Sequence, residues 1–444
     1  MEKLNSSISH RPMYLRRFGQ IAGIFLIILA LCFGLYKLFF DPHRGTIMYF
    51  TVSEKLDKTL SREEAIEDLD LMMHYLKERH PACLQNIPEE VITQYKSELS
   101  AMSEQPTVLE LWRSASAILA LMKDGHTYIN HFSEDLSELP VSFTINQDDL
   151  YLSWSDNGPY RVIAIEGQAL ETLYADFIRR FSYEREIYAR FQFARRLPRK
   201  GYLEFLGLDS SKGIEITCDT PTGQQKTAFA LVQPENEISD EPFVSYEINP
   251  EYSLGILRLR SCIYNEEYRS TLRDFFSQVR DEDIQHIAVD LRGNGGGNSY
   301  VINEFLRYLN IDKYKIYGSM SARMGPCIMN SIDWSSSNKK YQDLLFEGKV
   351  YALTSINSFS SALDFAVVLQ DYGLAKIIGE SPGGMPSSYG DSLYFQLPNS
   401  KLGVSISYKY FERVDASKNE LPLIPDYETS AATAEEKLIS IIKG

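Results

Sequence analysis

Three short stretches of this sequence combine residue types that could carry out hydrolysis. In the first, Ser358-Phe-Ser-Ser-Ala-Leu-Asp-Phe-Ala366, an apolar segment ends and a helical pattern begins. Ser360 lies at the predicted start of that helix, where backbone amides and the positive end of the helix dipole would surround its hydroxyl. This setting suits a nucleophile whose attack creates an oxyanion. Because serine is also a favoured helix N-cap, the position by itself fits a purely structural role equally well.

The second stretch, Val289-Asp-Leu-Arg-Gly-Asn-Gly-Gly-Gly-Asn298, runs from an apolar strand pattern directly into a glycine-rich turn. Glycine allows positive φ angles and the close approach of a substrate, so successive amides of the turn could point at a developing oxyanion or a bound carboxylate. A phosphate-binding loop is one alternative, but the Gly-Lys-Ser/Thr ending of such a loop is missing, and no GxGxxG frame opens a βαβ unit. A turn without a chemical role is the other alternative.

The third stretch, Lys123-Asp-Gly-His-Thr127, places a histidine in a turn directly after a helical pattern. A histidine that follows a flexible glycine could reach another domain and act as a general base, because its ordinary pKa lies close to neutrality. Most loop histidines are only solvated, so a catalytic role for His126 is supported mainly by the presence of the other two stretches. No comparable setting surrounds His10, His43, His131 or His286.

The elements that must position these stretches form an α/β pattern in the last part of the chain. The predicted strands are 254–259, 286–291, 350–354 and 375–378, and the predicted helices are 268–279, 300–309 and 361–372. Alternating strands and helices favour a sheet with parallel strands, in which functional groups gather where strands end and helices begin. Residues 250–444 are therefore the predicted catalytic α/β core.

Two further regions precede the core. Capping-box patterns of the Ser/Thr-x-x-Glu type begin at Ser61 and at Thr107, each ahead of apolar residues at helical spacing. Residues 61–131 are therefore a predicted helical subdomain, which carries His126. Residues 132–249 contain short β-like runs broken by one helical patch, which predicts a strand-rich middle region.

An almost uninterrupted apolar run covers residues 18–40, and its length matches the roughly 20 residues that span a bilayer. Its one charge, Lys37, lies near the end of the run, where it can snorkel. We expect residues 1–17 to be cytoplasmic, residues 41–60 to be a linker, and the remainder to be extracytoplasmic, because arginines precede the run at positions 11, 16 and 17. A cleavable signal peptide is the alternative, but the run exceeds a typical signal core and no clear small-x-small site follows it.

Composition excludes several classes of function. The chain of 444 residues is 44% hydrophobic and 24% charged, which is typical of globular proteins. Its formal net charge of −15 gives no electrostatic support for nucleic-acid binding. The five cysteines lie far apart in sequence and show no zinc-ligand spacing, so we expect neither a disulfide framework nor a zinc site.

Together, the three stretches resemble the signatures of the C-terminal-processing (tail-specific) peptidases and the tricorn-core serine peptidases. The matching segments, in the family's order, are Asp124-Gly-His-Thr127, Asp290-Leu-Arg-Gly-Asn-Gly-Gly-Gly297, Phe359-Ser-Ser-Ala-Leu-Asp-Phe-Ala-Val-Val-Leu-Gln-Asp-Tyr-Gly-Leu-Ala375 and Ile378-Gly-Glu-Ser-Pro-Gly-Gly384. The resemblance covers roughly residues 61–430 and is weakest between 132 and 245. It implies a serine-type endopeptidase with protein or peptide substrates, no metal or organic cofactor, and a ClpP/crotonase-like α/β core.

The resemblance also distinguishes two catalytic styles. In the serine/lysine style, a lysine follows the turn after the nucleophile helix, but here that position is Met385, and Lys376 lies too early, on a strand that we expect to be buried. The tricorn-like style uses the histidine of the Asp-Gly-His-Thr motif, which is His126. By this resemblance Ser360 attacks, His126 accepts its proton, and the amide of Ser361 together with Gly295 or Gly296 forms the oxyanion hole.

The acidic residue that orients the histidine is less narrowly defined. Relatives of the tricorn type carry it shortly before a Pro-Asp pair, which is Pro425-Asp426 here. Glu420 fits the usual offset within one residue, and Asp415 is the competing candidate. Either side chain could equally be a solvated loop charge.

Other interpretations stay open at the level of sequence. The segment Val162-Ile-Ala-Ile-Glu-Gly167 is similar to one stretch of a PDZ-like insertion, although it is too short to establish a carboxylate-binding groove. Acyl-CoA chemistry on the same fold needs no serine nucleophile and is usually cytosolic, which the predicted anchor opposes. A degenerate protein that only binds peptides or apolar ligands is the non-enzymatic alternative. Fluorophosphonate labelling separates the hydrolase from both.

Overall fold

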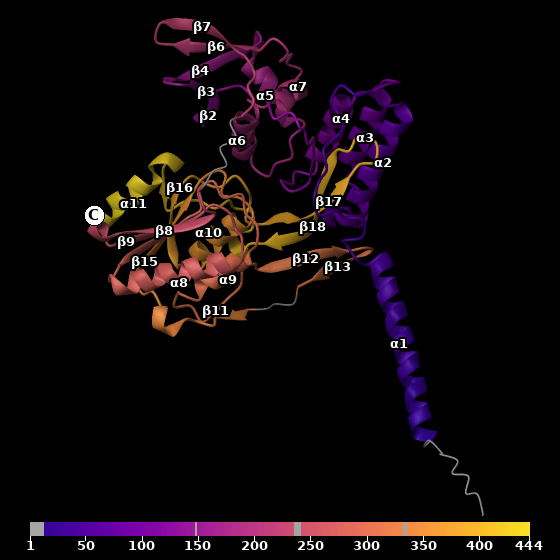
Figure 1. The fold of residues 1–444 in the computed structure, drawn as a ribbon, viewed down its shortest axis with the longest axis vertical. Helices are drawn as coiled ribbons and strands as arrows, with labels where there is room; N and C mark the ends of the chain where they lie inside the picture. The colour runs from indigo at the N-terminus through magenta and orange to yellow at the C-terminus, as the bar shows by residue number, and fades with distance from the viewer. Residues whose placement is uncertain (1–12, 147–148, 235–240, 332–334) are drawn as a thin grey trace, which may run out of the picture.

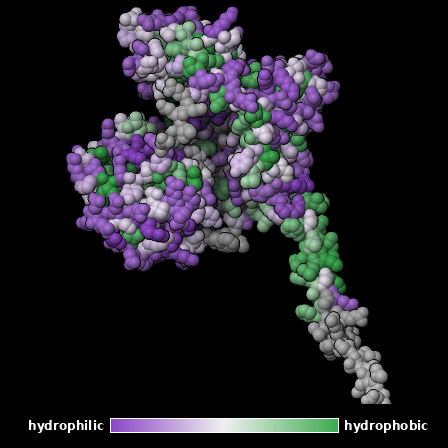
Figure 2. Space-filling view, viewed as in Figure 1, coloured by the Kyte–Doolittle hydropathy of each residue, from purple (hydrophilic) through white to green (hydrophobic). Residues whose placement is uncertain are grey.

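The computed structural model describes residues 13–146, 149–234, 241–331 and 335–444. Figure 1 shows a long helix, α1 (Met13–Phe39), that projects away from three packed parts. These parts are a helical subdomain, a strand-rich region and an α/β core. Figure 2 shows α1 as a hydrophobic surface that contrasts with the largely hydrophilic faces of the packed parts. Residues Gln20–Phe39 have a mean hydropathy of 2.4 and are not buried against the protein, so this helix is long and apolar enough to cross a bilayer.

The helical subdomain contains α2 (Arg62–Arg79), α3 (Glu89–Ala101) and α4 (Val108–Ala120). Both predicted capping boxes are present, since Ser61 pairs with Glu64 and Thr107 with Glu110 at the starts of α2 and α4. The helices pack against a sheet whose strands come mostly from the C-terminal part of the chain. Its members are β1 (Tyr128–Asn130), β12 (Ser319–Met324), β13 (Cys327–Asn330), β17 (Ser388–Gln396) and β18 (Gly403–Glu412). The short strand β1 therefore ties the His126 segment to the C-terminal part of the chain.

The strand-rich region is an antiparallel sheet flanked by helices. Its path order is β2 (Ser142–Asn146), β3 (Asp149–Trp154), β4 (Asn157–Ile165), β6 (Ile214–Thr220) and β7 (Gly223–Phe229), and β5 (Gln168–Ala169) pairs with β4. The helices are α5 (Leu170–Ile178), α6 (Glu186–Arg196) and α7 (Lys200–Phe205). This region has a hydrophobic core of its own, which includes Leu152, Ile216 and Phe193.

The α/β core contains a six-stranded sheet in the order β19-β16-β15-β10-β9-β8. Its strands are β8 (Val244–Asn249), β9 (Leu254–Leu259), β10 (His286–Asp290), β15 (Lys349–Thr354), β16 (Ala375–Gly379) and β19 (Tyr427–Glu428). All neighbours are parallel except the edge strand β8, which is antiparallel to β9. Because β8 belongs to this sheet, the core begins a few residues before the predicted boundary at 250.

Alternate residues of the central strands bury two separate hydrophobic layers, as the period of two in a strand requires. Leu257, Val289 and Ala352 face α8 (Glu266–Asp281), α9 (Tyr300–Leu306) and α10 (Ser361–Asp371). Residues such as Ile256 and Leu353 face the C-terminal helix α11 (Ala434–Lys443) on the other side. Two short strands, β11 (Lys313–Tyr314) and β14 (Ser336–Ser337), form a separate pair.

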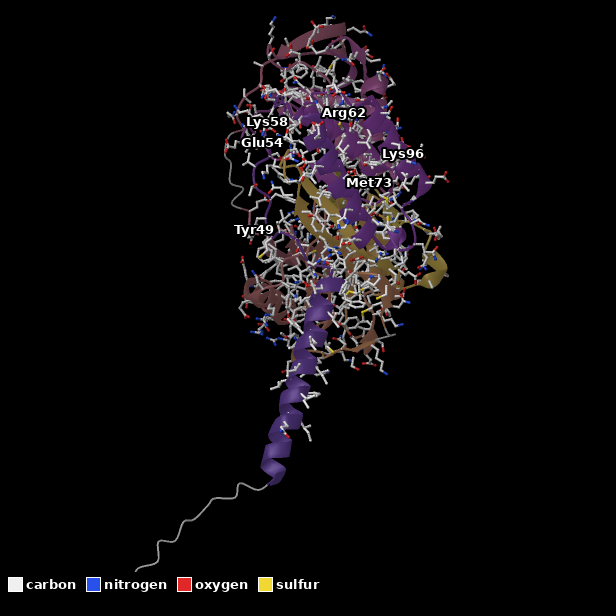
Figure 3. All side chains as sticks on the ribbon, turned by 90° about the vertical axis from the view of Figure 1, so that its right-hand side faces the viewer. Tyr49, Glu54, Lys58, Arg62, Met73 and Lys96 are labelled. Atoms are coloured by element: carbon white, nitrogen blue, oxygen red, sulfur yellow. The ribbon has the colours of Figure 1, made fainter. Side chains whose placement is uncertain are left out.

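Residues 41–60, the predicted linker, are packed against the sheet rather than extended freely. The amide of Ile47 donates to the carbonyl of Tyr394, and the ring of Phe50 stacks on Phe132 at 4.6 Å. Figure 3 labels Tyr49, Glu54 and Lys58 along this segment as it passes beside the sheet toward α2. The apolar helix α1 is therefore joined to the folded part by a fixed segment.

Candidate active site

Three loops that are distant in sequence meet at one place. They are the turn between β15 and α10, which carries Ser360, the glycine-rich loop after β10, and the turn before β1, which carries His126. Two cavities, of about 570 and about 610 Å³, adjoin this place, and both Ser360 and His126 line each of them. The two side chains that sequence analysis selected as nucleophile and base therefore face the same space.

Ser360 stands in a strained backbone conformation, with φ +53° and ψ −128°. A positive φ at a residue other than glycine costs about 1–3 kcal/mol and persists only where the surrounding structure enforces it. The hydroxyls of the neighbouring serines are already occupied, because Ser358 Oγ donates to Leu291 O (2.7 Å) and Ser361 Oγ to Gly297 O (2.8 Å). In the described part of the chain, the Ser360 hydroxyl has no such partner and does not cap the helix.

The glycine-rich loop lies directly against Ser360. A Cβ atom added at Gly296 would come within 2.7 Å of the Ser360 Cβ, so only glycine allows this approach. The Gly296 amide donates to Asn294 Oδ1 (2.8 Å), and the Asn294 side chain is fully buried. By contrast, the described structure records no hydrogen bond for the amides of Gly295 and Ser361. These two N–H groups are available to an oxyanion, whereas that of Gly296 maintains the shape of the loop.

A buried carboxylate, Asp124, holds the turn that carries His126. Its Oδ1 accepts the His126 backbone amide (2.9 Å), and its Oδ2 accepts the Thr127 hydroxyl (2.6 Å) and lies 3.2 Å from His80 Nε2. Burial raises the pKa of Asp124, but the hydrogen bond and the charge of His80 outweigh burial and lower it to about 2. His80 is the C-cap of α2, and its ring also contacts this carboxylate.

The His126 ring stacks on Phe359 with its centroid 4.9 Å away. Both ring nitrogens are buried and make no hydrogen bond in the described structure. Nδ1 lies 3.8 Å from Asp124 Oδ1 and 3.9 Å from Glu184 Oε1. These distances exceed a hydrogen bond, although catalytic hydrogen bonds are often long in structures without substrate. Burial lowers the pKa of His126, so the ring is neutral and able to accept a proton near pH 7.

Glu184, in the loop between α5 and α6, was not identified from the sequence. Its Oε2 accepts the Met385 amide (2.6 Å), whereas its buried Oε1 points toward His126 and has no hydrogen-bond partner in the described structure. Burial raises the pKa of Glu184 to about 8. No motif in the sequence marks this residue, because it belongs to the region where the family resemblance is weakest.

The nearest ligand atoms of Asp124, His126 and Glu184 lie within 4.8 Å of one another, a spacing that could hold a metal ion. Both Asp124 oxygens, however, already accept hydrogen bonds from the protein. The cluster is therefore better suited to moving a proton than to binding a cation.

The structure does not bring the two predicted acidic partners to His126. Glu420 is exposed and forms no ion pair with His126 in the described structure, and Asp415 caps a short 3₁₀ turn while pairing with Lys418. Lys376, expected on a buried strand, is exposed and pairs with Asp426 at 2.7 Å. Met385 occupies the loop that touches Glu184.

Comparisons with known proteins agree with this architecture. Residues 253–429 match the profile of Peptidase family S41, and this segment contains Ser360 but not His126. No curated protein matches the sequence significantly.

Among solved structures, the chain is similar to mature CPAF, with 13% identity, a TM-score of 0.62, and coverage of 86% of this chain and 96% of that chain. Mature CPAF complexed with lactacystin gives 13% identity, a TM-score of 0.61, and coverage of 86% and 97%. At this identity the likeness demonstrates a shared fold, which extends beyond the family match to include the helical and strand-rich parts. The family match and the fold confirm the resemblance found in the sequence: residues 253–429 are similar to Peptidase family S41, and the chain is a serine peptidase.

Proposed function

We propose that this serine peptidase hydrolyses peptide bonds through an acyl-enzyme, with Ser360 as the nucleophile and His126 as the general base. The observation that supports this most strongly is the contrast among three serines of one turn. The hydroxyls of Ser358 and Ser361 are hydrogen-bonded inside the protein, whereas that of Ser360 faces the cavities shared with His126. A reactive serine must keep its hydroxyl free of structural bonds so that the base can take its proton.

In the proposed mechanism, His126 accepts the Ser360 proton as the oxygen attacks the substrate carbonyl, and it later donates that proton to the leaving amine. The amides of Ser361 and Gly295 stabilise the oxyanion. Gly296 contributes mainly by its missing side chain, because its own amide is bound to Asn294. Water then hydrolyses the acyl-enzyme by the reverse sequence of proton transfers.

Glu184 is the proposed positioning residue for the base. Its Oε1 is the carboxyl oxygen near His126 Nδ1 that no other group uses, whereas both Asp124 oxygens are engaged. A small rotation of the ring would let Nδ1–H donate to Glu184 and leave Nε2 free to accept a proton. Glu420 is exposed and forms no ion pair with His126 in the described structure, so we assign this role to Glu184 instead.

We also propose that α1 remains as a membrane anchor and that the peptidase faces the extracytoplasmic side. The apolar surface of α1 supports an anchor, and the arginines at its N-terminal flank support the orientation. The fixed segment after the helix would hold the active site at a constant distance from the bilayer. Protease treatment of intact cells tests this topology, because a protected, membrane-bound domain would contradict it.

Labelling with a fluorophosphonate tests the catalytic assignment. We expect the wild-type chain to be labelled and Ser360→Ala to lose both labelling and peptide hydrolysis. Ser361→Ala is the matched control, since it keeps its backbone amide and should still be labelled. Labelling of Ser361 in the Ser360→Ala variant would move the assignment by one residue, and a wild-type chain that is never labelled would refute it.

A further inference from the structure

A series of hydroxyl groups runs along the wall of the second cavity, the one of about 610 Å³, from Asp364 to the glycine-rich loop. The Tyr317 hydroxyl lies 2.8 Å from Asp364 Oδ2 and 3.0 Å from Ser299 Oγ. Ser299 Oγ in turn lies 2.9 Å from Ser361 Oγ, which donates to the Gly297 carbonyl at 2.8 Å. The proposed mechanism uses only the backbone amide of Ser361, so it gives no role to this hydroxyl series.

The hydroxyl series connects three elements around the proposed oxyanion hole. Ser361 and Asp364 are one turn apart on α10, so their side chains lie on the same face of that helix. Ser299 lies between the glycine-rich loop and α9, and Tyr317 precedes β12. The two amides proposed for the oxyanion hole, those of Ser361 and Gly295, therefore belong to segments that the hydroxyl series ties together.

The number of available protons makes the hydroxyl series depend on Asp364. Its four oxygen–oxygen contacts need four protons, but the hydroxyls of Ser299, Tyr317 and Ser361 supply only three. Burial raises the pKa of Tyr317, so this hydroxyl keeps its proton. When Asp364 is ionised, one contact therefore lacks a proton and its two oxygens face each other unbonded. When Asp364 Oδ2 carries a proton, each group donates to the next, and the series ends at the Gly297 carbonyl.

The surroundings of Asp364 favour its protonated form. Burial raises the pKa of Asp364 to about 7, and it raises that of the nearby Cys262 thiol to about 12, so this thiol stays neutral. The other titratable side chains that line the cavity are those of His126, Glu184, Tyr300, Tyr389, Asp391 and Lys409. Asp391 and Lys409 pair with each other, and no ion pair joins Asp364 to a cation among the described residues. No neighbouring cation therefore stabilises the ionised form.

We propose that Ser299, Tyr317 and Asp364 are positioning residues for the oxyanion hole, and that their hydroxyl series is complete only when Asp364 carries a proton. The inference rests on the proposed function, because it concerns the Ser361 amide of the same active site. The complete series holds the Ser361 side chain against Gly297 and so fixes α10 relative to the glycine-rich loop. An oxyanion hole stabilises charge best when its donors are fixed before the reaction. Because the oxyanion forms only during the reaction, breaking the series should lower kcat and leave KM unchanged.

Steady-state kinetics of the full-length chain in detergent, on one peptide near pH 7, tests the positioning role. We expect Ser299→Ala to lower kcat about three- to tenfold, the scale of one neutral hydrogen bond, with unchanged KM. Ser299→Thr keeps the hydroxyl and should restore kcat. Ser361→Ala should lower kcat by a similar factor. Adding Ser299→Ala to Ser361→Ala should cause no further loss, because both changes break the same series.

Ser277→Ala is the control for these variants. Ser277 Oγ donates to Arg273 O within α8, and this serine does not line either cavity, so the change should leave kcat unaltered. A raised KM with unchanged kcat in Ser299→Ala would mean that Ser299 binds the substrate directly. Losses that multiply in the double variant would mean that the two serines act separately. Either result would overturn the inference.

Thermal unfolding of the same proteins tests the proton without any catalysis. The wild type loses stability as pH rises through the raised pKa of Asp364, because its folded form holds the proton. In Ser299→Ala, protonation of Asp364 no longer completes a hydrogen bond, so the pKa of Asp364 should fall and this loss should shrink. We therefore expect Ser299→Ala to lower the melting temperature more at pH 5 than at pH 7.5, and Ser277→Ala to change it equally at both.

An equal effect of Ser299→Ala at the two pH values would show that the hydroxyl series does not depend on the proton of Asp364, and the inference would fail. A wild type that cleaves no peptide would refute the proposed catalysis instead. The unfolding measurement would then still decide whether the hydroxyl series holds a proton, so the two failures are distinguishable.

Discussion

The two cavities that meet at Ser360 and His126 differ in the ionisable groups that line them. The first is lined by Arg195 and Arg196, for which the described part of the chain shows no carboxylate partner. The second is lined by the carboxyl groups of Glu184, Asp364 and Asp391. Burial raises the pKa of Glu184 to about 8 and that of Asp364 to about 7, so near pH 7 Glu184 is mostly protonated and Asp364 is about half protonated.

This difference follows from the physical properties of the two side chains. A buried carboxylic acid can avoid the cost of desolvating its charge by remaining protonated. Arginine cannot lose its proton in the accessible pH range, so its charge stays until an anion arrives. The first cavity therefore keeps its positive charge over the accessible pH range, whereas the second changes charge with pH.

Replacing His126, one of the residues that line both cavities, should have the largest effect. His126→Ala removes the general base, and we expect hydrolysis to fall by several orders of magnitude, on the scale of ~10⁶ known for loss of a triad member. Lys376→Ala is the control, since this exposed lysine forms a surface ion pair worth about 0–1 kcal/mol. Steady-state kinetics on one peptide compares the hydrolysis rates of the two variants with that of the wild type. An active histidine variant together with an inactive lysine variant would show that the base is assigned wrongly.

Changing the acidic cavity alone should have an intermediate effect with a distinctive pH dependence. Glu184→Gln keeps an acceptor for the Met385 amide but removes the carboxylate, and we expect kcat to fall by roughly 10²- to 10⁴-fold. Wild-type activity should rise with pH until the His126–Glu184 pair has lost a proton. In the wild type this proton is lost near the Glu184 pKa of about 8. In Glu184→Gln only His126 remains to lose a proton, and its pKa lies below its ordinary value, so the activity of the variant should rise at lower pH.

Glu420→Gln is the matched control for this prediction, because Glu420 is an exposed glutamate that does not contact His126. Its pH–rate profile should coincide with that of the wild type. If Glu420→Gln shifts the profile and Glu184→Gln does not, the acidic partner predicted from the family resemblance is the correct one.

The smallest expected effect concerns stability. Asp364, partly buried in α10, accepts a hydrogen bond from the Tyr317 hydroxyl (2.8 Å). Its pKa rises from 3.8 to about 7 on folding, so the folded state holds a proton that the unfolded state releases, and wild-type stability falls as pH rises through this window. Asp364→Asn should remove this decrease in the free energy of unfolding, which is at most about 1.4 kcal/mol for each pH unit.

Thermal unfolding of the two proteins at pH 5 and at pH 7.5 measures this difference. The melting temperature of Asp364→Asn relative to wild type should be higher at pH 7.5 than at pH 5. An unchanged difference between the two pH values would mean that Asp364 is charged in the folded protein, and the contrast between the cavities would then disappear.

Features that depend on local sequence pattern could be predicted from the residues alone. Strand and helix periods predicted the α/β core, and the structure confirms its parallel sheet. The Ser360 turn and the glycine-rich loop were recognisable because a tight strand-to-helix turn restricts residue types over a few consecutive positions. The capping residues Ser61 and Thr107 were identified correctly for the same reason.

The groups that surround the base become apparent only in the folded chain. Glu184 reaches His126 from a different region, across a loop with no fixed sequence spacing, so no pattern along the chain could identify it. The packing of residues 41–60 and the unpaired charges of Arg195 and Arg196 likewise depend on contacts between distant segments. Burial shifts the pKa values of Glu184 and His126, and this burial arises only when the three parts of the molecule fold against one another.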